Sequence, residues 1–267
     1  MGQPPIVTIT TDFGIDDHFV GTMKGVILNI NPSVQFVDIC HRVNSYDILD
    51  GALTLALSYR FFPGGAIHLV VVDPGVGSSR RPIAVRSSQY TFVAPDNGVL
   101  SFIFEREAKV EVRHVTASQY FLQPLSNTFH GRDIFAPVAG WLSKGVAMDQ
   151  LGAPITDYVK IAPPRPKRVE EGRVEGVVLK VDKFGNLITN LAPEDLPELL
   201  PGTARPFRIA IHDYKVTRLY SSYSMGQPSE LFAIWGSSGY LEVCRNLGSA
   251  ASALQASQGS EVKVAVD

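Results

Sequence analysis

The chain is poor in cysteine, has no long apolar run and carries no excess charge of either sign. Cys40 and Cys244 lie far apart and in no CxxC or Cys/His cluster, which argues against a disulfide framework or zinc site and favours a reducing, cytoplasmic location. No uncharged apolar stretch reaches about 18 residues, so no membrane span is predicted. The 24 basic and 26 acidic residues disfavour nucleic acid or an anionic membrane as the main partner.

Over residues 1–160, strand-like and helix-like hydrophobic patterns alternate, which is typical of a mainly parallel α/β sheet. The run 66–73 is apolar almost throughout, as expected of a strand covered on both faces. Strands are predicted in 5–11, 34–39, 66–73, 82–87 and 90–96, and helices within 12–32, 46–62, 97–107 and 131–145. For the first helix, Asp16 or Asp17 is the predicted N-terminal cap, and Asn31-Pro32 ends the pattern.

Residues 161–172, IAPPRPKRVEEG, combine prolines with mixed charges and are predicted to be a linker between domains 1–160 and 173–267. Beyond it the patterns are short strands separated by turn residues, predicted at 174–181, 186–191, 206–212, 231–236, 240–244 and 262–266. This organisation predicts a small C-terminal β-barrel after the α/β domain.

Polar clusters stand where ligands of α/β sheets bind, at the carboxyl ends of strands. Asp12 follows the first strand, Asp73 follows the third, and Asn97 lies in APDNG after a later one. His130 lies in NTFHGRD, which opens the last helix of the domain. These clusters could converge although they are distant in sequence.

Each cluster also has a simpler interpretation. Asp-Pro-Gly and Asp-Asn-Gly form turns whatever the function, and His130 could be an ordinary residue at a helix start. Asp12, Asp16 and Asp17 could form a magnesium site. The loop GVGSSR could bind phosphate, but it lacks the P-loop pattern and leads into a strand.

The C-terminal domain has two polar stretches that hairpin turns would also explain. VDKFGNLITN contains Asp182 and Asn186, and WGSSGYLEVCRN contains Ser237, Ser238 and Arg245. Composition and spacing therefore predict a two-domain protein with a polar site, without identifying its ligand.

Six stretches, taken in order, resemble one family. They are TDFGIDDHFVGTMKGVI, VVDPGVGSSRRPIAV, APDNGVL, FHGRDIFAPVA, DKFGNLITN and GSSGYLEVCRN. Together they are similar to the S-adenosyl-L-methionine (SAM) hydroxide adenosyltransferases, which hydrolyse SAM to adenosine and are related to 5′-halogenating enzymes. The resemblance covers residues 6 to about 250.

The resemblance implies an α/β domain, a C-terminal β-barrel and a homotrimer with SAM bound between subunits. It places Asp73, Arg80 and His130 in the catalytic set and Asp12 on the ribose hydroxyls. Asp182 and Ser237 would bind the methionine amine and carboxylate, and Asn186 an adenine edge. The remaining substrate-binding candidates that the resemblance brings forward are Tyr46, Asn97, Tyr223, Ser238 and Arg245.

The implied reaction suits these residue types. Methionine leaves a sulfonium as a neutral thioether, so the site needs only an activated water in line with C5′. Asp73, kept ionised by Arg80, or His130 could be the base, and the sequence leaves this open. No metal or cofactor is expected, because SAM is itself the substrate and no cluster has convincing metal-ligand spacing.

Alternative functions remain open at this stage. Halogenating relatives tend to have a non-acidic residue at position 73, no histidine at 130, and arginine where this chain has Ser238. A non-catalytic SAM or adenosine sensor could use the same pocket. A metal-dependent phosphohydrolase would instead depend on the early aspartates.

Overall fold

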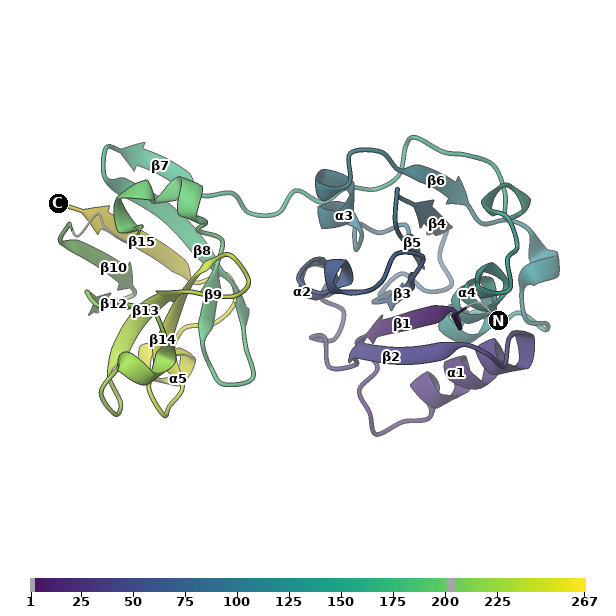
Figure 1. Ribbon diagram of the computed structural model, residues 1–267, viewed down its shortest axis with the longest axis horizontal. Helices are drawn as coiled ribbons and strands as arrows, with labels where there is room; N and C mark the ends of the chain where they lie inside the picture. Colours follow the sequence, from purple (N-terminus) through teal and green to yellow (C-terminus); the bar gives the residue numbers. More distant parts are fainter. Residues whose placement is uncertain (1–2, 201–204) are drawn as a thin grey trace. The chain divides into compact units, whose positions relative to one another are not determined.

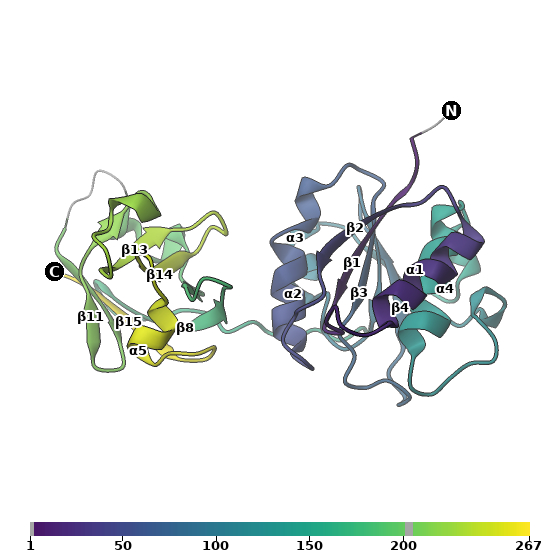
Figure 2. The same ribbon diagram turned by 90° about the horizontal axis from the view of Figure 1, so that it is seen from below.

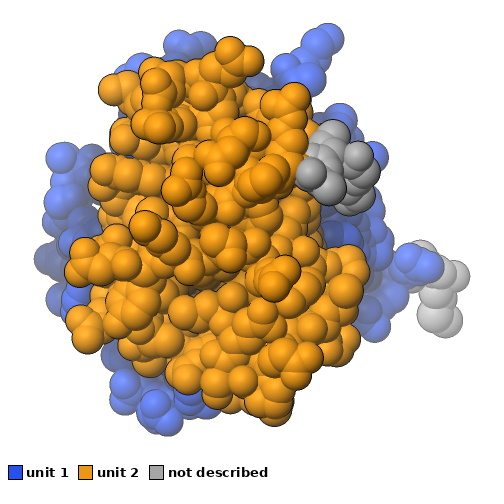
Figure 3. All heavy atoms as spheres, turned by 90° about the vertical axis from the view of Figure 1, so that its left-hand side faces the viewer, with its two compact units in different colours: residues 1–162 blue, residues 163–267 orange. Residues whose placement is uncertain are grey.

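The computed structural model describes residues 3–200 and 205–267. The chain divides into two compact units, Met1–Ala162 and Pro163–Asp267, which Figure 3 colours separately. Each unit has a buried hydrophobic core of its own. No helix in the described ranges has the length and apolar character needed to cross a bilayer.

Unit 1 is built on a six-stranded sheet in the order β2-β1-β3-β5-β4-β6 (Figure 1). The neighbours β2, β1, β3 and β5 pair in parallel, whereas β4 is antiparallel to both β5 and β6. The predicted mainly parallel sheet is thus confirmed, and β6 is a strand that the hydrophobic pattern did not predict. The strands are β1 Ile6–Thr11, β2 Gln35–Cys40, β3 Ile67–Val71, β4 Pro82–Arg86, β5 Thr91–Pro95 and β6 Glu111–His114.

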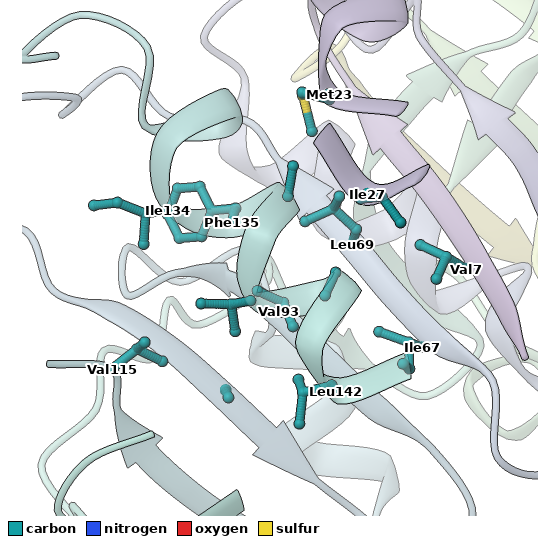
Figure 4. Close-up of a cluster of buried hydrophobic side chains, with 14 of the residues drawn as sticks. Val7, Met23, Ile27, Ile67, Leu69, Val93, Val115, Ile134, Phe135 and Leu142 are labelled. Atoms are coloured by element: carbon teal, nitrogen blue, oxygen red, sulfur yellow. The ribbon is translucent and has the colours of Figure 1, made fainter. Parts of the chain in front are cut away.

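Helices cover both faces of this sheet, with α1 and α4 on one side and α2 and α3 on the other (Figure 2). All of β3 is buried, and its alternate side chains enter different cores. Ile67 and Leu69 belong to the cluster drawn in Figure 4, whereas Val70 belongs to the cluster on the opposite face. The helices are α1 Phe19–Ile30, α2 Ile48–Ala56, α3 Ser101–Arg106 and α4 Ala136–Ser143.

Three helix predictions need correction. Helix α1 begins after His18, and no side chain caps it, so the predicted capping by Asp16 or Asp17 is wrong. The second helix ends at Ala56, where the Ser58 hydroxyl bonds to the carbonyls of the preceding turn, and a 3-10 turn follows. The last helix opens with a π-helical segment, Gly131–Phe135, before α4.

Unit 2 is a nine-stranded sheet in the order β11-β10-β15-β8-β9-β14-β13-β12, with β7 paired to β8. The sheet curls so far that β11, at one edge, contacts β13 near the other edge. The predicted barrel is therefore a curled, partly open one. The elements are β7 Lys167–Glu170, β8 Arg173–Val181, β9 Leu187–Thr189, β10 Phe207–Ile211, β11 Tyr214–Val216, β12 Leu219–Tyr220, β13 Leu231–Trp235, β14 Leu241–Arg245, α5 Ala250–Leu254 and β15 Glu261–Val266.

The predicted linker 161–172 is only partly irregular, because β7 lies inside it. Its four residues are exposed, and β7 pairs antiparallel with β8. Four exposed residues carry no hydrophobic alternation, which is the signal by which a strand is recognised in sequence.

Candidate functional site

The loop 73–81 leaves the buried strand β3 and folds back on itself. The Ser78 hydroxyl donates to the Gly75 carbonyl at 2.6 Å and accepts from the Arg80 amide at 3.2 Å. Gly77 has φ +78° and lies against the Asn127 backbone, so a side chain there would be both strained and in collision. The loop therefore packs against the segment that leads to His130. Its fold also brings the Arg80 side chain back to Asp73.

Asp73, Arg80 and His130 form one buried cluster. Arg80 Nε donates to Asp73 Oδ1 at 3.0 Å, and Nη2 donates to Oδ2, giving a bidentate pair whose side chains are only 6% and 5% exposed. Arg80 Nη2 also lies 3.1 Å from His130 Nδ1. The guanidinium carbon of Arg80 lies over the Phe135 ring, 5.1 Å from its centroid, which is a cation–π contact.

The tautomer of His130 follows from its contact with Arg80. A guanidinium only donates, so Nδ1 accepts and the proton of the neutral ring lies on Nε2. Burial, and secondly the positive charge of Arg80, lower the pKa of His130. The imidazole is therefore neutral near pH 7 and presents an N–H group.

The electrostatics of Asp73 reflect two opposing effects. Burial raises the pKa of its carboxyl, and the charge and hydrogen bonds of Arg80 act against this shift. A buried carboxylate with a raised pKa that remains ionised is a stronger base than an exposed one. In addition, Arg80 Nη1 is buried without a hydrogen-bond partner among the described residues, so this cluster has an unused donor.

A second carboxylate anchors the segment that carries His130. Asp133 is fully buried, pairs with Arg132 at 2.6 Å and accepts from the Ser126 amide at 2.8 Å. The Asp133 carbonyl also accepts from the Leu122 amide at 2.8 Å. Asp133 and Phe135 were not among the predicted site residues, although the adjacent Arg-Asp pair in HGRD was a usable signal.

The cluster opens into a small aromatic cavity of about 130 Å³. Phe13, Phe19 and Phe129 pack around it with ring centroids 5.2 to 6.0 Å apart. Asp73 and His130 line the same cavity. Asp73 and His130 thus face a space that is lined mainly by apolar side chains and is suited to a water molecule beside a carbon-rich ligand.

The other predicted residues of unit 1 lie in loops that follow other strands of the same sheet. Asp12 Oδ2 accepts from the amide of Tyr46 at 2.9 Å, and Tyr46 is 75% exposed with φ 67°. Asn97 donates to the Val72 carbonyl at 2.9 Å and accepts from the Val99 amide at 3.1 Å. The Asn97 amide group is therefore already engaged in shaping its own turn.

In unit 2, Asp182 and Asn186 build the turn between β8 and β9. Asp182 Oδ1 accepts from the amides of Phe184 and Asn186, at 2.8 and 2.9 Å, and Oδ2 accepts from Asn186 Nδ2 at 2.8 Å. Such a network rigidifies the turn. Asn186 is buried, whereas Phe184 is exposed.

Two of the remaining unit 2 candidates, Tyr223 and Ser238, contact Glu242, a residue that was not among the predicted site residues. Tyr223 Oη donates to Glu242 Oε2 at 2.9 Å, and Ser238 Oγ donates to Oε1 at 3.2 Å. Ser237 is exposed on the adjoining turn, and Arg245 Nε donates to the Ser229 carbonyl at 3.2 Å. Glu242 is the one charged residue in the run YLEVC, and this is the feature by which the sequence could have marked it as a site residue.

Comparison with known proteins identifies the family. The SAM hydroxide adenosyltransferase N-terminal and C-terminal domains match residues 7–152 and 176–263. A Salinispora tropica protein named (R)-S-adenosyl-L-methionine hydrolase is 34% identical over 99% of both chains, and a Nocardia brasiliensis fluorinase is 27% identical over 99% of this chain and 98% of its own. The crystal structure of an uncharacterized conserved protein from Thermotoga maritima, 34% identical, superposes with a TM-score of 0.90 over 97% of this chain and 99% of that one. This chain therefore belongs to the SAM hydroxide adenosyltransferase family.

Proposed function

We propose that this protein hydrolyses SAM to adenosine and L-methionine by in-line attack of an activated water on C5′. The observation that carries the proposal is the buried Asp73–Arg80–His130 cluster facing an aromatic cavity. Relatives named SAM hydrolases share 33 to 34% identity, whereas those named fluorinases share 26 to 27%. An ionised Asp73 would also repel a halide, so hydrolysis is favoured over halogenation.

The geometry favours Asp73 as the proton acceptor. His130 Nδ1 accepts from Arg80, so the ring presents Nε2–H, which can orient a water but not deprotonate it. The water oxygen forms a bond to C5′ while the C5′–S bond breaks and its electron pair stays on sulfur. The water proton passes to Asp73, and Arg80 holds the carboxylate in place throughout.

For substrate binding, we assign the ribose hydroxyls to Asp12, whose Oδ1 is not used by the Tyr46 amide. Asp182 and Ser237 would bind the amino-acid end, and Asn186 an adenine edge. Tyr46, Tyr223, Ser238 and Arg245 would line the pocket. Asn97 is better supported as a turn residue than as a ribose ligand, because its amide bonds within the turn.

The deciding experiment is incubation of the purified protein with SAM in ¹⁸O-labelled water, followed by mass spectrometry. We expect adenosine labelled at the 5′-oxygen and unlabelled L-methionine. Formation of a 5′-halo-5′-deoxyadenosine in chloride or fluoride would instead establish the halogenating alternative. Binding of SAM with no turnover would establish a sensor and contradict the proposal.

We predict that turnover requires no added metal. The leaving group departs as a neutral thioether, so the reaction needs no Lewis acid to stabilise it. Protein treated with EDTA and then desalted should form adenosine at the untreated rate. Loss of activity that magnesium restores would support the metal-dependent reading of Asp12, Asp16 and Asp17 instead.

We further propose a cytoplasmic homotrimer with each site shared between one subunit's unit 1 and a neighbour's unit 2. The assigned residues divide between the two units, and a head-to-tail contact that closes into a ring would pair them. Light scattering should therefore give three times the mass of 29.1 kDa. A fully active monomer would contradict this.

Subunit mixing gives a sharper test of the shared site. Asp73→Asn and Asp182→Ala inactivate opposite halves of the proposed site. In trimers co-expressed with both variants at equal levels, about a quarter of shared sites would combine two intact halves. We expect activity to reappear in the mixed trimers. Mixed trimers as inactive as either parent would show that each chain builds its site alone.

A further inference from the structure

No cationic side chain is paired with Glu242 in the part of unit 2 that the structure describes. Glu242 lies on β14, between β9 and β13 (Figure 1), and is only 4% exposed. Its hydrogen-bond donors are the neutral hydroxyls of Tyr223 and Ser238. Among the described residues no basic side chain is paired with it, and burial together with the nearby charge of Asp182 raises its pKa. A buried carboxylate in such surroundings is costly unless a cation joins it.

The local structure is arranged to keep this carboxylate in place. Gly236 lies directly against the Glu242 carboxyl group, so any side chain at position 236 would occupy the same space. Tyr223 reaches Glu242 from a separate 3-10 turn, Tyr223–Met225, and Ser238 reaches it from the turn between β13 and β14. Three segments thus converge on one charged group.

One of the two hydroxyl donors to Glu242 is itself partly uncovered. Tyr223 is 48% exposed, although its hydroxyl reaches the buried carboxylate. An aromatic side chain that leads from the surface to a buried anion suits a ligand that has both a cationic group and apolar surface.

Resting on the proposed function, we propose that Glu242 is a specificity-determining residue that shares with Asp182 the binding of the α-ammonium group of SAM. SAM carries two positive charges, and the chemistry distinguishes them. The sulfonium charge disappears as the C5′–S bond breaks, so a carboxylate beside it would stabilise the substrate more than the transition state. The ammonium charge persists through the reaction, so a carboxylate there improves binding without slowing the chemical step.

The test replaces Glu242 by glutamine and compares two substrates. SAM carries the ammonium group, whereas 5′-(dimethylsulfonio)-5′-deoxyadenosine keeps the sulfonium but lacks the amino acid. We expect Glu242→Gln to raise KM for SAM about tenfold or more, the range for a lost charge-assisted hydrogen bond, with kcat retained. KM for the analogue should be unchanged. Inhibition by L-methionine should weaken by the same factor as SAM binding, and inhibition by adenosine should not.

A matched control exists in the same unit. Glu230 accepts from Tyr220 Oη at 3.1 Å, so Glu230→Gln removes a carboxylate from a similar tyrosine–glutamate pair and should leave all these constants unchanged. Equal losses for SAM and the analogue would show a merely structural role and overturn the inference, as would a rise in kcat, which would place the carboxylate at the sulfonium. If the wild-type protein does not hydrolyse SAM, the proposed function fails first. Weakened L-methionine binding in Glu242→Gln, measured by calorimetry, would still test the ammonium site alone.

Discussion

Replacing Asp73 by asparagine should lower kcat for SAM hydrolysis about 10²-fold or more while leaving SAM affinity nearly unchanged. The substitution keeps size and shape but removes the negative charge and the ability to accept the water proton. Because Asp73 is proposed to face the nucleophile, its loss should reduce kcat and kcat/KM together. Single-turnover kinetics with SAM, alongside calorimetric binding, separate these effects.

The neighbouring Arg81–Asp96 pair supplies a control for the structural cost of the change. Asp96 is also buried, accepts from Arg81 Nε at 2.9 Å and accepts from the Val159 amide at 2.8 Å. Asp96→Asn should therefore lower the melting temperature without an Asp73-like loss of kcat. If Asp73→Asn behaves like Asp96→Asn, with near-normal kcat, the catalytic assignment is wrong and DPG is only a turn.

Changing His130 to alanine should also lower kcat, because it removes the Nε2–H group that is proposed to orient the water.

Since burial raises the pKa of Asp73, the wild-type rate should increase with pH as Asp73 ionises, at a pH above the ordinary range of an aspartate. In Asp73→Asn this ascending limb should disappear. An unchanged pH profile in that variant would exclude Asp73 as the titrating group.

The second large effect concerns acid stability and comes from His68, away from the site. His68 is fully buried on β3, bonds through Nδ1 to Thr8 Oγ1 at 2.7 Å and stacks 5.2 Å from the Phe92 ring. Burial lowers its pKa from 6.5 to about 4. Between these values the unfolded chain binds a proton that the folded chain excludes, so stability falls as pH decreases through this window. The expected contribution is about 3 kcal/mol.

Urea unfolding at pH 7 and pH 4 measures this contribution in wild type and in His68→Gln. Glutamine can still bond to Thr8 but does not titrate, so the acid-induced loss of unfolding free energy should be smaller in the variant by about 3 kcal/mol. His18→Gln changes an exposed histidine and should show the wild-type dependence. Equal losses in wild type and His68→Gln would mean that His68 is protonated in the folded state.

The sequence by itself determined the architecture and the family. The apolar run 66–73, the alternation of strand and helix patterns and the short strands after the linker are local features, so they predicted an α/β domain followed by a curled β domain. Six ordered motifs identified the family, and Asp73 with Arg80 could be paired from sequence because only six residues lie between them.

Only the tertiary structure decided the relations between distant segments. His130 joins Arg80 across 50 positions, and the resulting bond places its proton on Nε2. Helix α1 begins at Phe19 although Asp16 and Asp17 precede it, because the chain bends there and neither carboxylate reaches the helix. In the sequence, Glu242 is one charged residue in a predicted strand. Folding brings two hydroxyl groups to its carboxylate and excludes water from it. Burial and pairing between remote segments set these properties, and neither is encoded in local periodicity or spacing.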